Sequence, residues 1–326
     1  MGSDISVHIV TFNSAKDIEA CLTAVSKQSY PIHELVIIDN HSTDNTVKCI
    51  EKWHRAYSYH RLKVVENSNN IGFAAAHNQA IRLTNTNYCL ILNPDVELTP
   101  NYIKNTIGVL KNDETLGSVT GKLYRDLKNE IIDSTGIVIK KNRRSFDRGA
   151  GEKDVGQWEK LTDIFGASGA AAIYNRKMIN DIMVSGQFFD EDFFAYKEDI
   201  DVAWRAQIRG WRAKFVPEAI AIHQRGWKDE KKRKEIPLFI RHHSYINRYY
   251  MIIKNDKAFF LFLHGPIIIF YELMSFIYAI IIERELLAAW SRAIRIFPSM
   301  YLKRKFIQSK QLKSTKEIYR FFKGLW

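Results

Sequence analysis

The first ninety or so residues alternate short apolar runs with amphipathic segments, and this alternation constrains the fold more than any other feature. Residues 5–11, 34–39, 61–67 and 87–92 have the composition of strands, and helical patterns separate them. Strands that alternate with helices form right-handed βαβ units. We therefore predict an α/β fold: a Rossmann-like, mostly parallel central sheet flanked by helices.

Polar side chains follow three of these strands at the point where each strand ends. Thr11 and Asn13 follow the first, Asp39 follows the second, and Asn93 and Asp95 follow the fourth. In open α/β sheets ligands bind beyond the carboxyl ends of the strands. These side chains are therefore expected to converge on one site.

Beyond residue 122 the pattern loosens into mixed strands and loops, and a second ordered block follows. Residues 164–175 are predicted to form a strand, 176–182 a short helix, and 199–209 a helix that ends at Gly210. A last strand is predicted over 211–223, ending at His223.

The C-terminal part combines apolar runs with a basic tail. Runs 258–271 and 273–282 are too short to span a bilayer. From residue 291 onward ten basic residues accompany one acid, which accounts for most of the net charge of +12. Short apolar helices beside a cationic tail favour interfacial attachment to an anionic membrane surface. The alternatives are helices packed on the catalytic domain or in a homo-oligomer interface, and a solvated basic helix with no partner.

The cysteines and the N-terminus favour a cytoplasmic location. Cys21, Cys49 and Cys89 lack paired or metal-ligand spacing, which predicts reduced thiols. The N-terminus enters a strand almost at once, so a signal peptide is not expected.

Several motifs occur together in an order that resembles a known family. The chain resembles an inverting family 2 glycosyltransferase with the GT-A fold, particularly the bacterial rhamnosyltransferase-like branch, over about residues 4–250. The motifs are IIDNHSTDNT, NIGFAAAHN, LNPDVEL, GASGAAAIYNR and FFDEDFFAYKEDIDVAWRAQIRGW, followed by the strand that ends at His223.

The resemblance implies a domain plan and a reaction. Residues 1–236 would form the glycosyltransferase domain, with a nucleotide-sugar half to about 122 and an acceptor half over 123–236. Residues 237–326 would form a helical, basic, amphipathic region. The implied enzyme moves a sugar, L-rhamnose from dTDP-L-rhamnose, onto a lipid-linked or polysaccharide acceptor of the bacterial cell envelope. It would act as a peripheral protein on the inner face of the cell membrane.

Five residues are candidates for nucleotide binding. The carboxylate of Asp39 can accept a hydrogen bond from a pyrimidine N3–H, and Thr11 and Asn13 suit the nucleoside. Gly72 permits close backbone approach or a sharp turn into a helix. Asp44 either contacts the nucleotide or stabilises a turn and the start of a helix.

The resemblance also implies a divalent cation, Mn²⁺ or Mg²⁺, that stabilises the departing diphosphate. Asp95 resembles the last acid of the DXD metal motif, and His223 resembles the late metal ligand. Asn93 stands where the first acid usually lies, so it is expected to contact the nucleotide instead. The alternative for residues 93–95 is an Asn-Pro-Asp turn without a ligand.

A cluster of six acids should contain the general base. Within it, the motif KEDID resembles the family's ED motif, which makes Asp199 the catalytic base and Glu198 the second candidate. Alternatively, the acids complement the positive N-terminus of the following helix. The cluster consists of Asp190, Glu191, Asp192, Glu198, Asp199 and Asp201.

Weaker candidates surround this set. The small-residue stretch 166–170 offers a surface for a sugar ring. Arg205 is a candidate contact for the acceptor or the diphosphate, and Arg225 and Trp227 follow His223 closely enough to close over the diphosphate. Within the small-residue stretch the candidates are Ser168 and Gly169.

Two rival functions remain. The same site could use a UDP-hexose or UDP-galactofuranose. The positive charge could instead indicate nucleic-acid binding, but the acidic strand ends repel phosphate, so no nucleic-acid partner is expected.

Overall fold

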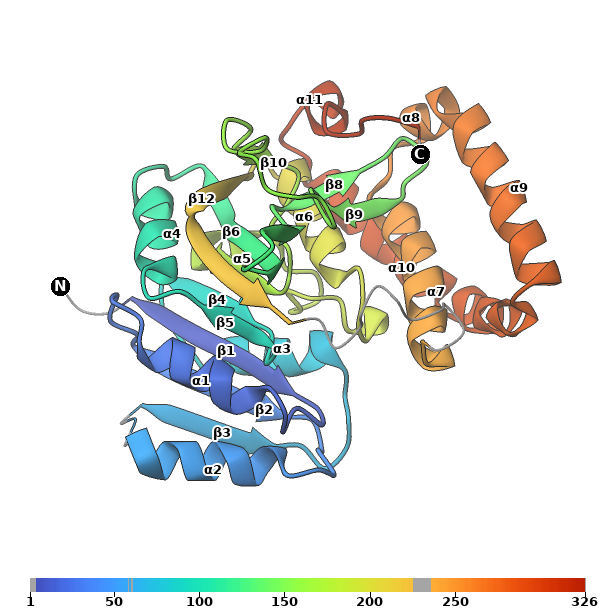
Figure 1. Ribbon diagram of the computed structural model, residues 1–326. Coiled ribbons are helices and arrows are strands. Elements are labelled where there is room, and N and C mark those ends of the chain that lie inside the picture. Colours follow the sequence, from blue (N-terminus) through green and yellow to red (C-terminus); the bar gives the residue numbers. More distant parts are fainter. Residues whose placement is uncertain (1–3, 58, 60, 225–235, 326) are drawn as a thin grey trace.

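The computed structural model describes residues 4–57, 59, 61–224 and 236–325, and one mixed sheet runs through its larger part (Figure 1). Across this sheet the strand order is β10-β12-β6-β11-β4-β1-β2-β3, with β5 paired to β12 and β7 paired to β6. A separate hairpin pairs β8 with β9. The strands are β1 Ile5–Thr11, β2 Glu34–Asp39, β3 Leu62–Glu66, β4 Tyr88–Leu92, β5 Val96–Leu98, β6 Leu116–Asp126, β7 Ile131–Ser134, β8 Ile137–Ile139, β9 Ser145–Asp147, β10 Asp163–Ile164, β11 Ala171–Asn175 and β12 Arg212–His223.

The first four strands are parallel, as the βαβ pattern predicts. β1 pairs with both β2 and β4, and β2 pairs with β3. The register places Thr11 opposite Asp39, so these strand ends lie side by side at one edge of the sheet. In the second half, β11 runs antiparallel between β4 and β6. The predicted α/β fold with a central sheet is confirmed.

Helices cover both faces of the sheet, and a helical region follows it (Figure 1). Glycine allows the sharp ends that the sequence predicts, for example Gly210 with φ of 90° just after α6. The helices are α1 Ile18–Ser26, α2 Thr46–Tyr57, α3 Phe73–Arg82, α4 Tyr102–Lys111, α5 Arg176–Ile182, α6 Glu198–Ile208, α7 Leu238–Asn255, α8 Ala258–Leu263, α9 Gly265–Ile281, α10 Ala289–Ser309 and α11 Thr315–Tyr319, with short 3₁₀ turns η1 Glu191–Phe193 and η3 Arg284–Ala288.

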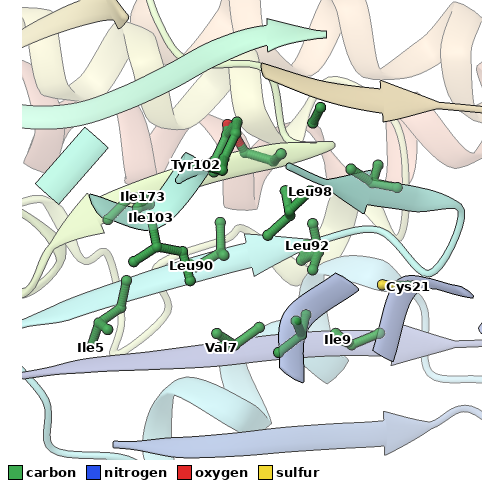
Figure 2. Close-up of a cluster of buried hydrophobic side chains, with 14 of the residues drawn as sticks. Ile5, Val7, Ile9, Cys21, Leu90, Leu92, Leu98, Tyr102, Ile103 and Ile173 are labelled. Carbon is green, nitrogen blue, oxygen red and sulfur yellow. The ribbon is translucent and has the colours of Figure 1, made fainter. Parts of the chain in front are cut away.

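Strand β4 shows how the sheet separates two cores. Successive side chains of a strand point to opposite faces. Leu90 and Leu92 pack with β1, α1 and α4, as Figure 2 shows, whereas Cys89 and Ile91 pack with α3, α5 and α6 on the other face. The polar tip of Tyr102 is satisfied inside the first core, because its hydroxyl donates to the Ala171 carbonyl at 2.7 Å.

The C-terminal helices share a hydrophobic core with the preceding α/β part. Trp204 of α6 packs edge-on against Phe322, with ring centroids 5.1 Å apart. Phe193 packs in the same way against Tyr250 of α7, at 5.9 Å. The described residues from 237 to 325 are thus mainly helical, and they pack as a continuation of the α/β part.

Helix α9 stands away from the body of the molecule (Figure 1). It runs through Glu272, so the break between the two apolar runs lies earlier, at His264, where α8 ends. Among the described residues no single helix combines the length and apolarity needed to cross a bilayer. Taken together, α9 and residues 284–309, bent by 113° between them, meet that criterion by length and composition.

Candidate active site

Strand pairing brings together two residues that lie far apart in the sequence. The antiparallel pairing of β12 with β5 places His223 opposite Val96, the residue that follows Asp95. His223 Nε2 lies 3.4 Å from Asp95 Oδ1. Both predicted metal ligands therefore lie at one point on the sheet edge.

A buried carboxylate orients the imidazole of His223. Nδ1 of His223 lies 2.8 Å from Asp133 Oδ2, and Asp133 is also paired with Arg125. Burial alone would lower the pKa of His223, but the hydrogen bonds to Asp133 and Asp95 raise it to about 9. Nε2 therefore carries a proton at neutral pH, which a cation would displace on binding. With that proton lost and Nδ1–H held by Asp133, the Nε2 lone pair would face a ligand, the arrangement common in metal sites.

The donor set around Asp95 fits a cation that substrate oxygens help to hold. A carboxylate suits both Mn²⁺ and Mg²⁺, and Mn²⁺ accepts an imidazole more readily than Mg²⁺ does. Within the described part of the chain, no group of three His, Cys, Asp or Glu side chains is placed to hold a metal alone. Magnesium-type sites often use one or two carboxylates together with substrate phosphates and water. Asp95 and His223 would thus hold the cation jointly with a diphosphate.

A cavity of about 390 Å³ opens beside this pair and contains the predicted general base. Asn93, His223, Glu198 and Asp199 all line it. Asn93 is anchored through its backbone N–H, which donates to the Ala170 carbonyl at 2.9 Å. Asn93, His223 and the two acids of α6 thus face one space, whereas Thr11, Asn13 and Asp39 do not line this cavity.

The two acids at the start of α6 form no ion pair with the described residues, and their pKa values are raised. Burial, followed by the charge of Asp199, raises the pKa of Glu198 to about 8. Glu198 Oε2 has no hydrogen-bond partner in the described part of the chain. Burial also raises the pKa of Asp199, to about 6, although the Gly169 N–H donates to its Oδ2 at 3.1 Å. Burial therefore outweighs the effect of the helix N-terminus, which favours the ionised form of both acids.

Three other acids of the cluster serve the fold. Lys254 of α7 donates to Asp190 and Asp201 at 2.5 and 2.9 Å, and Lys303 of α10 pairs with Asp190 and Asp192 at 2.6 and 2.7 Å. Their carboxylates are therefore neutralised away from the cavity. Lys303 belongs to the basic tail, so part of the tail's charge is satisfied internally.

The turn that precedes Glu198 and Asp199 is strained, and a side chain of α7 holds it. Phe194, Tyr196 and Lys197 have φ values of 62°, 73° and 68°, a region that L-residues seldom adopt. The side-chain amide of Asn247 donates to the carbonyls of Phe193, Ala195 and Tyr196 at 2.8–2.9 Å. One side chain thus fixes three peptide groups of this turn.

The residues predicted to bind the nucleotide, Thr11, Asn13 and Asp39, form hydrogen bonds with one another and with the loop that follows β2. Asp39 is buried, and its carboxylate accepts from Thr11 Oγ1 at 2.7 Å and from both the N–H and the hydroxyl of Ser42. Asn13 accepts hydrogen bonds from the backbone of Thr43. One lone-pair direction of Asp39 remains for a base N–H.

Asp44 has a structural role. Its carboxylate accepts from the backbone N–H groups of Thr46 and Ala15, at 3.0 and 3.1 Å, and from the Thr46 hydroxyl. Burial alone would raise the pKa of Asp44, but these hydrogen bonds lower it. Asp44 therefore stabilises the turn and the start of α2, which was the alternative to a nucleotide contact.

Gly72 permits a sharp turn into α3 and close packing. It precedes α3 with φ of 87°, and a Cβ there would lie 2.7 Å from the ring and the carbonyl oxygen of Phe194. The close approach is therefore to Phe194, and the expectation that a ligand approaches the Gly72 backbone is not supported.

The weaker candidates divide into three groups. Ser168 and Gly169 line the cavity beside Asp199. Arg205 is buried and bonds to Asp201 and to the Ile182 and Phe188 carbonyls, so its proposed contact with acceptor or diphosphate is wrong. Arg225 and Trp227 lie outside the described residues.

Four site residues were not anticipated from the sequence. Asp133 orients His223, while Asp147, Tyr196 and Lys197 line the cavity. Tyr196 and Lys197 sit within the quoted motif FFAYKED, so their position next to the acids was a usable signal. Asp133 and Asp147 lie in the segment of mixed strands, where no local pattern marks them.

The sequence matches Glycosyl transferase family 2 over residues 6–183 and Glycosyl transferase family group 2 over residues 98–291. The poly-beta-1,6-N-acetyl-D-glucosamine synthases of Staphylococcus aureus (strain COL) and Staphylococcus epidermidis are 26% and 24% identical to it over 220 residues. Those residues are 66% of this chain and 48% of each relative. The chain thus spans about half the length of the curated relatives it matches.

Solved structures share the fold at low sequence identity. GalNAc-T7 with UDP, GalNAc and Mn²⁺ has a TM-score of 0.67 at 13% identity, covering 98% of this chain and 56% of that one. The mannosyltransferase PcManGT from Pyrobaculum calidifontis, with GDP-Man and Mn²⁺, has a TM-score of 0.56 at 18% identity, covering 98% and 86%. These likenesses confirm the predicted GT-A architecture.

Proposed function

Because this chain belongs to glycosyl transferase family 2, we propose that it transfers a sugar from a nucleotide diphosphate sugar to an acceptor hydroxyl with inversion at the anomeric carbon. The observation that carries the proposal is one cavity lined by Asn93, His223, Glu198 and Asp199, with Asp95 3.4 Å from His223. Such a cavity offers a cation site and a general base to the same substrate.

Asp199 is the proposed general base. Burial raises the pKa of both acids, but two backbone N–H groups, of Gly169 and Ile200, donate to the Asp199 carboxylate and favour its ionised form. Glu198 Oε2 has no such donor among the described residues, which favours the protonated form of Glu198. Environments that push two carboxyl pKa values apart are a common means of assigning acid and base roles. The Gly169 N–H holds one oxygen of Asp199, which orients the carboxylate toward the acceptor.

In the proposed step, Asp199 takes the proton of the acceptor hydroxyl as its oxygen bonds to the anomeric carbon. The bond from that carbon to the diphosphate breaks, and its electron pair leaves with the nucleoside diphosphate. Asp95 and His223 would hold a divalent cation that offsets the charge of this leaving group. Asp133 keeps the His223 ring oriented for that role.

For the donor, the comparisons and the motifs point in two directions. The curated relatives are named poly-beta-1,6-N-acetyl-D-glucosamine synthases, which favours a nucleotide-linked N-acetylglucosamine. The replacement of the first DXD acid by Asn93, as in rhamnosyltransferase-like sequences, favours dTDP-L-rhamnose. We rank the N-acetylglucosamine donor first, because a match over 220 residues is stronger evidence than the identity of the single residue Asn93.

The test is a panel of nucleotide sugars assayed for nucleotide release in Mn²⁺, in Mg²⁺ and after EDTA. The panel contains UDP-N-acetylglucosamine, dTDP-L-rhamnose, UDP-glucose and UDP-galactofuranose. We expect one donor to dominate and EDTA to abolish release. Salt-sensitive binding to RNA or DNA, with no release from any donor, would overturn the proposal.

We also propose that the enzyme works as a peripheral protein on the inner face of the cell membrane. Large apolar side chains are exposed on α8, α9 and α10, among them Phe262 at 85% and Ile294 at 73%. Exposed apolar surface of this extent suits an interface with lipid. Flotation with anionic vesicles, but not with neutral ones, would support this; a stable dimer that ignores vesicles would overturn it.

A further inference from the structure

Three adjoining cavities lead from the catalytic acids to the C-terminal helices. The cavity with Asp199 adjoins a second of about 330 Å³, which adjoins a third of about 600 Å³. The second and third share Tyr245 and Tyr249 of α7 as lining. The first and second share Ser145, Phe146, Tyr196, Lys197 and Ser244.

The middle cavity is basic. Arg241 and Arg248 line it, but their charges are matched by Glu283 and Glu272, at 3.1 and 2.5 Å. Arg144 and Lys197 also line it. In the part of the chain that the structure describes, neither of these two side chains forms an ion pair, and Arg144 stacks on Phe146 and Tyr271.

The charged residues that line this cavity are all basic: Arg144, Lys197, Arg241 and Arg248. Burial, followed by the neighbouring charge of Arg248, lowers the pKa of Lys197 to about 8, although Asp199 and Glu198 act in the opposite direction. A charged group in such a place gains from an anion that also accepts hydrogen bonds. Phosphate and diphosphate groups meet both requirements.

The outer cavity is apolar. Of the described residues that line it, Glu272 alone is charged, and Arg248 and Tyr249 both hold the Glu272 carboxylate. Trp290 packs against Tyr249 with ring centroids 4.7 Å apart. The lining consists of Tyr245, Tyr249, Ile269, Glu272, Leu273, Phe276 and Trp290.

We propose that the middle and outer cavities form the acceptor subsite for a lipid-linked sugar. The lipid's phosphate or diphosphate lies beside Arg144 and Lys197, its hydrocarbon chain lies between α7, α9 and Trp290, and its sugar reaches Asp199. Along the three cavities the lining changes from carboxylates to cations to apolar side chains. This order matches the sugar, the phosphate and the hydrocarbon chain of such an acceptor. This inference rests on the proposed function and selects a lipid-linked acceptor over a free polysaccharide.

The test measures binding to the whole chain in EDTA, without donor. The probes are farnesyl diphosphate below its micelle concentration, inorganic diphosphate and farnesol. We expect farnesyl diphosphate to bind at least tenfold more tightly than either other probe. Phe276→Ser, in the outer cavity, should weaken farnesyl diphosphate about tenfold and leave inorganic diphosphate unchanged, because it removes apolar contact with the hydrocarbon chain only.

Arg144→Gln should weaken both diphosphates, because it removes a charge-assisted contact. Phe262→Ser is the matched control, since Phe262 is exposed on α8 and does not line the cavity. Equal binding of the two diphosphates, or equal effects of Phe276→Ser and Phe262→Ser, would overturn the subsite. Nucleotide release to water by the unaltered chain tests the enzyme assignment without any acceptor, so failure of the subsite is separable from failure of the enzyme assignment.

Discussion

Two sets of carboxylates lie within twelve residues of one another and have opposite fates. Asp190 and Asp201 lie against Lys254, and the cations outweigh burial and lower their pKa values. Glu198 and Asp199 face the cavity with no ion pair to a described residue, and burial raises theirs. The difference comes from α7, which delivers a cation to one set only. A carboxylate's role here depends on whether a distant segment reaches it.

The largest expected effect is on the cavity-facing set. Asp199→Asn should lower sugar transfer by roughly 10²–10⁴-fold, the range for a lost general base, and should leave nucleotide affinity nearly unchanged. Steady-state kinetics and calorimetry with the nucleotide check both parts. Asp192→Asn is the control from the lysine-paired acids and should retain activity. Loss of nucleotide binding in Asp199→Asn would reassign the residue.

The next effect is on the lysine-paired set. Lys254→Met leaves the buried Asp190 and Asp201 short of a counter-charge and should lower the free energy of unfolding by about 3–5 kcal/mol. Urea unfolding measures this. The exposed pair of Arg55 with Glu51 provides the control, and Arg55→Met should change stability by less than about 1 kcal/mol. An unchanged Lys254→Met midpoint would contradict the comparison.

The pH dependence of activity distinguishes the two sets, because the pKa is raised in the cavity-facing set and lowered in the lysine-paired set. A base acts when deprotonated, and the raised pKa of Asp199 means that kcat/KM should fall about tenfold per pH unit below about pH 6. A base with the lowered pKa of Asp190 would keep its activity to much lower pH. The profile should be recorded with saturating Mn²⁺, and circular dichroism at each pH should exclude unfolding. A flat profile down to about pH 4.5 would rule out Asp199.

The smallest effect concerns Asp44, which the structure places with the structural acids. Asp44→Ala should lower the free energy of unfolding by about 1 kcal/mol, as for loss of a helix-start hydrogen bond. Nucleotide affinity should change less than twofold. A drop in affinity beyond tenfold would instead move Asp44 to the nucleotide site.

Local patterns were sufficient for the elements that carry the site. The spacing of Ile200, Trp204 and Ile208 predicts α6, and Gly210 follows its end as expected. The apolar run before His223 predicts β12. Helix and strand periodicity depend on residues close together in the chain, so both can be predicted from a single sequence.

The partners of these elements could not be read in the same way. Asp95 and His223 meet through the pairing of β5 with β12, which no local pattern specifies, and the family resemblance alone indicated it. Arg205 was misassigned because its partners come from other segments, at Ile182 and Phe188. Lys254 neutralises acids more than fifty residues earlier, so their structural role depends on tertiary packing.

The amide of Asn247 has a mechanical consequence. Asn247 belongs to α7, which also lines the middle and outer cavities through Tyr245 and Tyr249. Its side-chain amide donates hydrogen bonds to three carbonyls of the turn that precedes Glu198. A shift of α7 along its axis would therefore move the peptide groups that precede Asp199, the proposed general base. A molecule bound against α7 would in this way change the position of Asp199.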